Sequence, residues 1–409
     1  MISLGRLMST PGVNRRTLIL KMLRLPRSKV QIGTPLPWSV RDEQGTLLLS
    51  KGHLVESEHL LDQLLLRGAY VDAEEARAVA LADAPQRPKT PVPPPNIFGL
   101  WDKTTDDLKK LLVSVTHQDD FPGRIEQFAR HLLELVDCNA DIAIYRCVRQ
   151  DNAQHFYFGY THAVYTAMLC ILMARHLKWS ETRLMSLVKA ALTMNQPILD
   201  LQGQMAGQDV PMKDKQRAAI HTHPTQCVEW LQKAGVTDAD WLTAIAQHHE
   251  RADGTGYPLG STEVCEMAVA LRVADTFTSR ISPRVMRPAL SPQEAVRQLY
   301  QEDKGGPLST AVIKELGIYP PGDFVKLASG ELGIVVQRTA NARAPIVASI
   351  TDTAGRPVPH TVRHDTAQPE FAIKATASDK VMLMRLPPER LFGFSLAPQA
   401  PVVRPKPVH

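Results

Sequence analysis

The chain has 409 residues, of which 44% are apolar and 22% charged, so it is neither wholly disordered nor collagen-like, and its length suits two to three domains. The formal charge of +5 arises near the N-terminus, where residues 1–31 hold seven basic side chains and no acidic one; the remainder holds 40 basic and 42 acidic side chains. We therefore expect no nucleic-acid partner, and because no run of 18 uncharged apolar residues exists, no membrane span.

Residues 1–30 predict a basic, flexible leader, whose apolar stretch is too short for a signal peptide. A true translation start at Met8 or Met22 is an alternative interpretation. Five cysteines are scattered along the chain without a Cys-x-x-Cys pair, which is typical of reduced thiols. This usage favours a cytoplasmic protein.

Residues 31–83 predict a small α+β domain. Short β-like runs at 38–40 and 47–49 flank an Asp-Glu-Gln-Gly turn, which is typical of a hairpin. Leucines at helical spacing predict a helix over 59–67, and residues 68–71 predict a further strand.

Six prolines within residues 84–95 predict an extended linker. Helical periodicity then dominates residues 96–317, with at least seven candidate helices. Residues 318–395 predict a small β-domain, and the proline-rich tail 396–409 predicts disorder. The strand-like runs of the β-domain lie at 325–327, 333–336, 346–348 and 381–383. The expected fold class is mainly α: an all-helical bundle flanked by two small domains.

Several histidines and one aspartate lie on apolar faces of the predicted helices, where a buried polar group needs a partner. The set consists of His162, His223, His248, His249 and Asp275. His223 precedes Pro224 at an expected helix start or turn. Each histidine alone is more often an ordinary core or surface residue. The set together predicts a shared metal site, because neutral imidazole and carboxylate are ligands of first-row metals.

The run from His248 to Pro258, HHERADGTGYP, joins two adjacent histidines at a predicted helix end to a loop rich in glycine. It closely resembles the signature of the HD-GYP family, whose members are metal-dependent phosphohydrolases acting on cyclic di-GMP. The resemblance extends from His162 to near Gly317 and includes Ala190-Ala191-Leu192, His223-Pro224 and Arg272 to Phe277.

This resemblance implies an all-helical bundle around a centre of two or three divalent transition-metal ions (Fe, Mn, Ni or Zn). It implies phosphate contacts from Arg284 and Arg287, although a solvated basic face is the alternative for that pair. Gly256, Tyr257 and Pro258 would contact the ligand or a GGDEF-domain cyclase partner. Family analogy also suggests a homodimer.

The sequence departs from the family pattern at the pair for which the family is named. A gap-free reading puts that His-Asp pair at Met194-Asn195. Asn195 is neutral and cannot bridge two cations as a carboxylate does, and the thioether of Met194 is a poor ligand for hard or borderline ions. The further departures are Phe158, Pro197-Ile198 and Thr278, where members of the family carry a carboxylate, a Gly-Lys pair and an Asp.

We expect one surviving metal seat at most, resembling His223, His248 and His249, and no confident catalytic residue. The leading hypothesis is a bacterial signalling protein that binds cyclic di-GMP or a GGDEF partner with weak or absent hydrolysis. A working phosphodiesterase with a reduced metal site is the first alternative, in which His162 or Asp275 recruits a second ion. A non-catalytic interaction scaffold is the second. The terminal domains show no cluster of chemically active residues.

Overall fold

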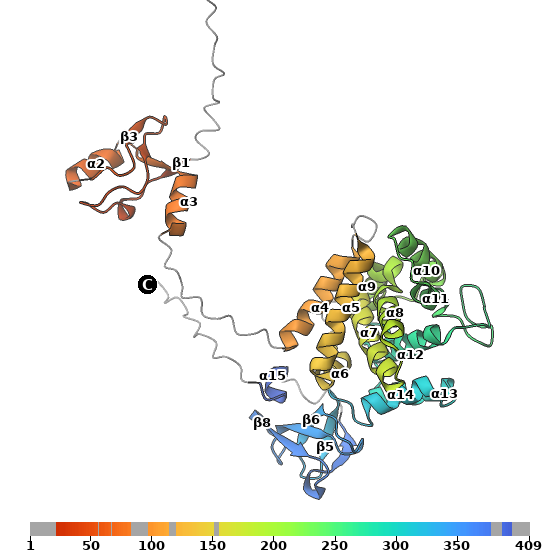
Figure 1. The fold of residues 1–409 in the computed structure, drawn as a ribbon. Coiled ribbons are helices and arrows are strands. Elements are labelled where there is room, and N and C mark those ends of the chain that lie inside the picture. Colours follow the sequence, from red (N-terminus) through yellow and green to blue (C-terminus); the bar gives the residue numbers. More distant parts are fainter. Residues whose placement is uncertain are drawn as a thin grey trace, which may run out of the picture. The chain divides into compact units, whose positions relative to one another are not determined.

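A computed structural model describes the chain in five stretches, and it forms two compact units, residues 1–93 and 94–409 (Figure 1). The described stretches are residues 22–82 without 56 and 67, 97–113, 120–150, 155–377 and 387–394. The predicted linker, tail and 381–383 strand, together with most of the predicted leader, lie outside the described residues.

The N-terminal unit contains a four-stranded antiparallel sheet in the order β1-β4-β2-β3. Its elements are β1 (Met22–Arg24), the 3₁₀ turn η1 (Arg27–Lys29), β2 (Val40–Arg41), β3 (Leu47–Leu49), α2 (Glu58–Leu66), β4 (Tyr70–Asp72) and α3 (Ala73–Ala82). The predicted leader boundary at residue 30 is wrong, because β1 pairs with β4 and Leu25 is buried in the same core as Trp38 and Val71.

The second unit is mainly helical, as predicted. Its helices are α4 (Ile97–Leu112), α5 (Phe121–Cys138), α6 (Ala140–Val148), α7 (Phe158–His176), α8 (Glu181–Thr193), α9 (Leu199–Gly207), α10 (Asp214–Lys233), α11 (Ala239–Gln247), α12 (Glu266–Ile281), α13 (Pro292–Glu302), α14 (Pro307–Leu316) and the short α15 (Pro388–Leu391). Short 3₁₀ turns, η3 (His155–Tyr157) and η4 (Gln196–Ile198), precede α7 and α9.

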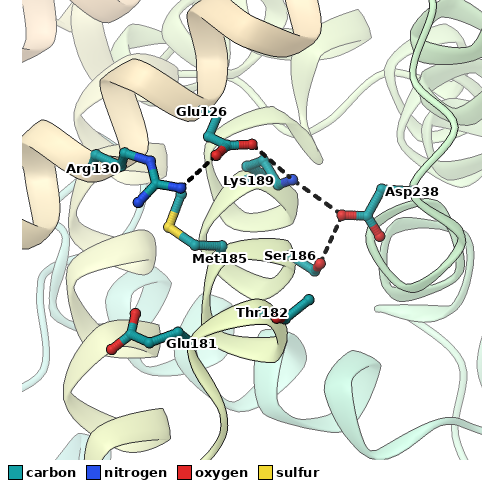
Figure 2. A pocket seen from close by; sticks show the side chains of 8 residues that line it. All are labelled: Glu126, Arg130, Glu181, Thr182, Met185, Ser186, Lys189 and Asp238. Atoms are coloured by element: carbon teal, nitrogen blue, oxygen red, sulfur yellow. Dashed lines mark hydrogen bonds and ion pairs between the residues drawn. The ribbon is translucent and has the colours of Figure 1, made fainter.

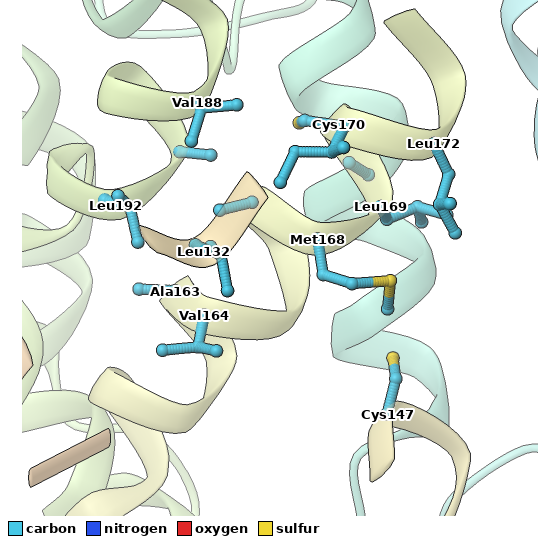
Figure 3. Packing of buried hydrophobic residues seen from close by; sticks show 14 of the residues in the cluster. Leu132, Cys147, Ala163, Val164, Met168, Leu169, Cys170, Leu172, Val188 and Leu192 are labelled. Carbon is cyan, nitrogen blue, oxygen red and sulfur yellow. The ribbon is translucent and has the colours of Figure 1, made fainter. Parts of the chain in front are cut away.

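Helix α7 lies at the centre of this unit, and 15 of its 19 residues are buried. Figure 3 shows its side chains, among them Met168 and Leu169, packed with Leu132 of α5, Cys147 of α6 and Val188 of α8. Burial around nearly the whole circumference explains why apolar residues occur on all its faces. Among the described helices, only the segment His155–His176 is long and apolar enough to cross a membrane, and 78% of it is buried inside the protein.

The C-terminal part of the second unit contains a five-stranded antiparallel sheet, ordered β8-β7-β6-β5-β9. The strands are β5 (Phe324–Leu327), β6 (Leu332–Gln337), β7 (Ile346–Thr351), β8 (Pro357–Asp365) and β9 (Ile373–Thr376), with the 3₁₀ turn η5 (Pro369–Phe371) between the last two. Sequence patterns indicated β5, β6 and β7 but missed β8 and β9.

This sheet shares the core of the helices rather than forming a separate domain. Successive side chains of a strand point to opposite faces. Ile334 and Val336 of β6 join the helical core, whereas Val335 between them packs in a second cluster with Val347 and Leu327. The predicted boundary at residue 317 therefore marks a change in periodicity, and residues on both sides of it belong to one packed unit.

Candidate metal centre

Three imidazoles converge where two helices meet. His223 lies within α10, while His248 is the C-terminal cap of α11 and His249 follows it. Their ligand atoms all lie within 4.8 Å of one another. The prediction that the two adjacent histidines end a helix is confirmed, whereas the predicted helix start or turn at His223 is wrong, because α10 continues through Pro224 to Lys233.

Backbone hydrogen bonds fix the tautomer of two of these rings. The Nδ1 of His223 lies 2.6 Å from the carbonyl oxygen of Ile220, and the Nδ1 of His248 lies 2.6 Å from that of Ile245. Because a carbonyl can only accept, each Nδ1 carries a proton and donates it. Each neutral ring therefore directs the lone pair of its Nε2 away from the helix backbone.

The two Nε2 atoms lie 3.2 Å apart. With both Nδ1 atoms protonated, this is a contact between two lone pairs, which a cation between them would stabilise. Two metal–nitrogen bonds of about 2.0–2.1 Å that span this separation enclose an angle of about 100°, close to that of a tetrahedral site. The donor set of three imidazoles thus fits one divalent transition metal.

Burial keeps these rings neutral. Desolvation, with the neighbouring His248, lowers the pKa of His223 to about 3. Desolvation also lowers the pKa of His248 and holds that of His249 well below its ordinary value. Neutral imidazole is the form that binds a metal, so the cluster is ready to ligate at neutral pH without losing a proton.

His162 and Asp275 form a separate pair. The Nε2 of His162 lies 2.7 Å from Oδ1 of Asp275, and both side chains are largely buried. Burial acts to raise the pKa of Asp275, but the hydrogen bond with His162 and the electrostatic effect of the neighbouring histidines His162, His249 and His248 together leave the pKa lowered. The five residues predicted as one ligand set therefore occur as a three-imidazole cluster and an adjoining hydrogen-bonded pair.

A pocket of about 190 Å³ opens beside both groups. Its lining includes Phe158, His162, Asn195, Gln202, Met205, His223, His249, Tyr257, Asp275, Ser279 and Arg284. Asn195 is thus part of the wall of this pocket, whereas Met194 is fully buried in the apolar core. Asn195 adds an amide to the pocket wall but no charge.

Arg284 gives the pocket its cation. Its guanidinium lies 4.7 Å from the ring centroid of Phe158, and it donates to the Oγ of Ser279 at 3.0 Å. Burial, with the nearby Arg287, lowers the pKa of Arg284 to about 10, so it stays protonated at neutral pH. Arg287 also donates to Ser279, but it is exposed and does not line the pocket.

The loop after the cluster contributes one side chain to the pocket. The ring of Tyr257 stacks on His249 with centroids 4.5 Å apart, and it also stacks on His221 with centroids 5.2 Å apart. Gly256 and Pro258 do not line the pocket. A Cβ on Gly256 would lie 2.4 Å from the backbone nitrogen of Arg251, so glycine is needed for the close packing of the loop.

Sequence reasoning missed the residue that holds this loop. Glu250 is 1% exposed, and its carboxylate oxygens accept from the amides of Leu259 at 2.7 Å and Ser261 at 2.9 Å. Arg272 donates to the carbonyl of Glu250 at 2.6 Å. A glutamate after two histidines gives no signal for such a role, because the amides that it binds lie 9 and 11 residues further along the chain.

The other end of α11 is also fixed by polar contacts (Figure 2). Its N-cap Asp238 accepts from the amide of Trp241 at 3.0 Å and from the hydroxyl of Ser186 at 2.7 Å. The ammonium of Lys189 lies 3.1 Å from the same carboxylate. These contacts line a surface pocket of about 430 Å³ and secure the helix whose far end carries His248.

Comparison with known proteins finds similarity over the region that holds this arrangement. Residues 146–305, which contain all five predicted ligands, match the HD domain family. The chain is 26% identical over 211 residues to a cyclic di-GMP phosphodiesterase of Pseudomonas aeruginosa, covering 49% of this chain and 48% of that protein, so it spans about half the length of this curated relative.

A solved structure of an HD-GYP-type protein from Bdellovibrio bacteriovorus aligns with a TM-score of 0.45 at 17% identity, covering 72% of this chain and 98% of that one. The matched region, the three converging imidazoles and the HHERADGTGYP loop agree with one another. Residues 146–305 of this chain therefore match an HD domain, and the loop that follows its paired histidines resembles the HD-GYP signature.

Proposed function

We propose that this chain binds cyclic di-GMP in the pocket beside a single metal seat and hydrolyses it weakly or not at all. The observation that carries the proposal is the division of the ligand set: three imidazoles converge, whereas His162 and Asp275 bond to each other beside the neutral Asn195. The similarity to a cyclic di-GMP phosphodiesterase supports the identity of the ligand.

The pocket suits one phosphodiester group. Arg284 offers a charged guanidinium for a phosphate oxygen, and Asn195 and Ser279 offer neutral donors. Its volume of about 190 Å³ is below the roughly 300–1,000 Å³ of sites that enclose a whole drug-sized ligand. A cyclic dinucleotide would therefore insert one phosphodiester and leave its bases against the rim.

Hydrolysis should be slow because the chain has Asn195 at the position of the carboxylate that bridges two metal ions. A bound metal ion would supply Lewis-acid polarisation of a phosphate oxygen and a more acidic water. In-line displacement at phosphorus is better served by two ions about 3.5–4 Å apart, which need a bridging anion. Asn195 cannot supply that anion, so the chain's own groups would bind and orient the ligand more effectively than they would cleave it.

The test is metal content and ligand binding measured together. Elemental analysis of the full chain is expected to find about one ion, lost in His248→Ala. Calorimetric titration with cyclic di-GMP is expected to show weaker binding in Arg284→Ala than in the matched control Arg287→Ala, because only Arg284 lines the pocket. Two ions per chain, or metal-dependent turnover abolished by His248→Ala, would overturn the proposal.

Those outcomes would establish the alternative, an active cyclic di-GMP phosphodiesterase. It has one observation in its favour, because His162 and Asp275 both line the pocket and a second ion could part them. A chain that binds neither metal nor nucleotide would instead be an interaction scaffold. A GGDEF-domain partner or a second copy of the chain would dock on the loop that bears Leu259, whose side chain is 82% exposed.

A further inference from the structure

We infer that Pro224 is a positioning residue of the metal seat: it leaves the carbonyl of Ile220 free to hold the ring of His223 in the tautomer that can ligate. The inference rests on the metal seat of the proposed function. It concerns a residue outside the three-imidazole cluster, which acts through the backbone.

Pro224 lies in the interior of α10, which runs from Asp214 to Lys233. In a regular helix the amide of residue 224 would donate to the carbonyl four residues earlier, that of Ile220. Proline has no N–H, and its ring pushes this carbonyl away from the helix ladder. The same oxygen accepts the Nδ1–H of His223 at 2.6 Å. The Nδ1–H of His223 thus replaces the backbone N–H that Pro224 lacks as the donor to Ile220.

The second ring obtains an equivalent partner in a different way. His248 caps α11, whose last residue is Gln247. The carbonyl of Ile245 therefore belongs to the last turn, where carbonyls lack an intrahelical amide partner. It accepts the Nδ1–H of His248, also at 2.6 Å. In this protein the histidine at the helix end uses a carbonyl that the helix leaves free, and the histidine inside the helix uses one that lacks its amide partner because of Pro224.

The consequence is a matched pair of Nε2 lone pairs 3.2 Å apart. In the opposite tautomer, the Nε2 of His223 would carry a proton that points toward His248 and blocks the ion. Groups that orient a ligand in this way commonly change metal affinity by about 10–100-fold when lost. In Pro224→Ala, the restored amide competes with His223 for the Ile220 carbonyl and returns it to the helix ladder.

The experiment compares full-length Pro224→Ala with the wild type and with Pro292→Ala, which removes a proline from the first turn of α13. Zn²⁺ affinity is measured by calorimetric titration, and thermal unfolding is measured with a chelator present. We expect Pro224→Ala to bind Zn²⁺ at least about 10-fold more weakly while melting at the same or a higher temperature, because proline is unfavourable inside a helix. Pro292→Ala should leave affinity unchanged.

A further readout needs no metal. ¹⁵N NMR of labelled histidines is expected to show protonated Nδ1 for His223 in the wild type and a mixture of tautomers in Pro224→Ala. Unchanged Zn²⁺ affinity, an unchanged tautomer, or a fall in affinity accompanied by a lower melting temperature would each overturn the inference. If the wild type binds no Zn²⁺ but the tautomer still depends on Pro224, the metal seat fails and the positioning of His223 stands.

Discussion

Replacing Glu250 with alanine is expected to release the loop after the histidine cluster while the helical core stays folded. The change removes both amide contacts of the carboxylate, at 2.7 and 2.9 Å. Hydrogen bonds to a charged group contribute about 1.5–3 kcal/mol each, so the loss spans about 3–6 kcal/mol. The freed amides of Leu259 and Ser261 can reach water once the loop opens, which puts the expected cost near the lower end, about 3 kcal/mol.

Native-state hydrogen exchange measures this cost locally. A cost of about 3 kcal/mol corresponds to a loss of about two orders of magnitude in the protection of the Leu259 and Ser261 amides. Glu250→Gln is the matched control, because the glutamine side chain keeps one acceptor oxygen. Its loss in the free energy of loop opening should be about half of that in Glu250→Ala. Zn²⁺ affinity should fall more in Glu250→Ala than in Glu250→Gln, since the loop carries the Tyr257 ring that stacks on His249.

Two results would refute this reasoning. Unchanged protection of the two amides together with a lower melting temperature would mean that Glu250 stabilises the core rather than the loop. Equal losses in Glu250→Gln and Glu250→Ala would mean that the negative charge matters and the individual acceptor oxygens do not.

Three further predictions concern the pocket, the core and the sheet. Met194→His combined with Asn195→Asp should raise the metal content toward two ions per chain by elemental analysis and produce measurable cyclic di-GMP turnover; metal content fixed at one would contradict the bridging argument. Leu169→Ala, at a fully buried position of α7, should lower the free energy of unfolding in urea by about 2–5 kcal/mol, and a smaller loss would show that the site collapses around the cavity. Burial raises the pKa of Asp323 from 3.8 to about 7, so the folded chain holds this proton more tightly and the free energy of unfolding falls as pH rises from about 4 to about 7. Asp323→Asn should make the melting temperature less dependent on pH between about 4 and 7. An unaltered pH dependence would exclude Asp323 as its source.

Local chemistry made much of the helical domain predictable. The helical period of the apolar residues, the adjacent histidines at a helix end and the resemblance of the loop all depend on residues close in sequence. Pro224 misled the prediction for the same reason, because a proline ordinarily ends or kinks a helix, and its place inside α10 depends on how the surrounding chain packs.

The contents of the site depended on contacts between distant residues. Sequence spacing could not tell that His162 bonds to Asp275, 113 residues away, rather than joining the three imidazoles. The anchoring role of Glu250 could not be predicted either, because it depends on the loop folding back so that the amides of Leu259 and Ser261 reach its carboxylate. The sequence also did not predict that the two faces of β6 pack in different clusters. Both faces of this strand carry apolar side chains, and such a run does not indicate which part of the chain each face contacts.

The sheet that follows the helices has a consequence for how the protein can be shortened. A chain ending at Gly317 would lack four apolar side chains that pack against the helical core, and the apolar surface that they cover would become exposed to solvent. These side chains are Ile334, Val336, Ala348 and Ile350. The helices and the sheet should therefore be kept together as one unit for expression or domain exchange, whereas the N-terminal unit, with a core of its own, can be moved independently.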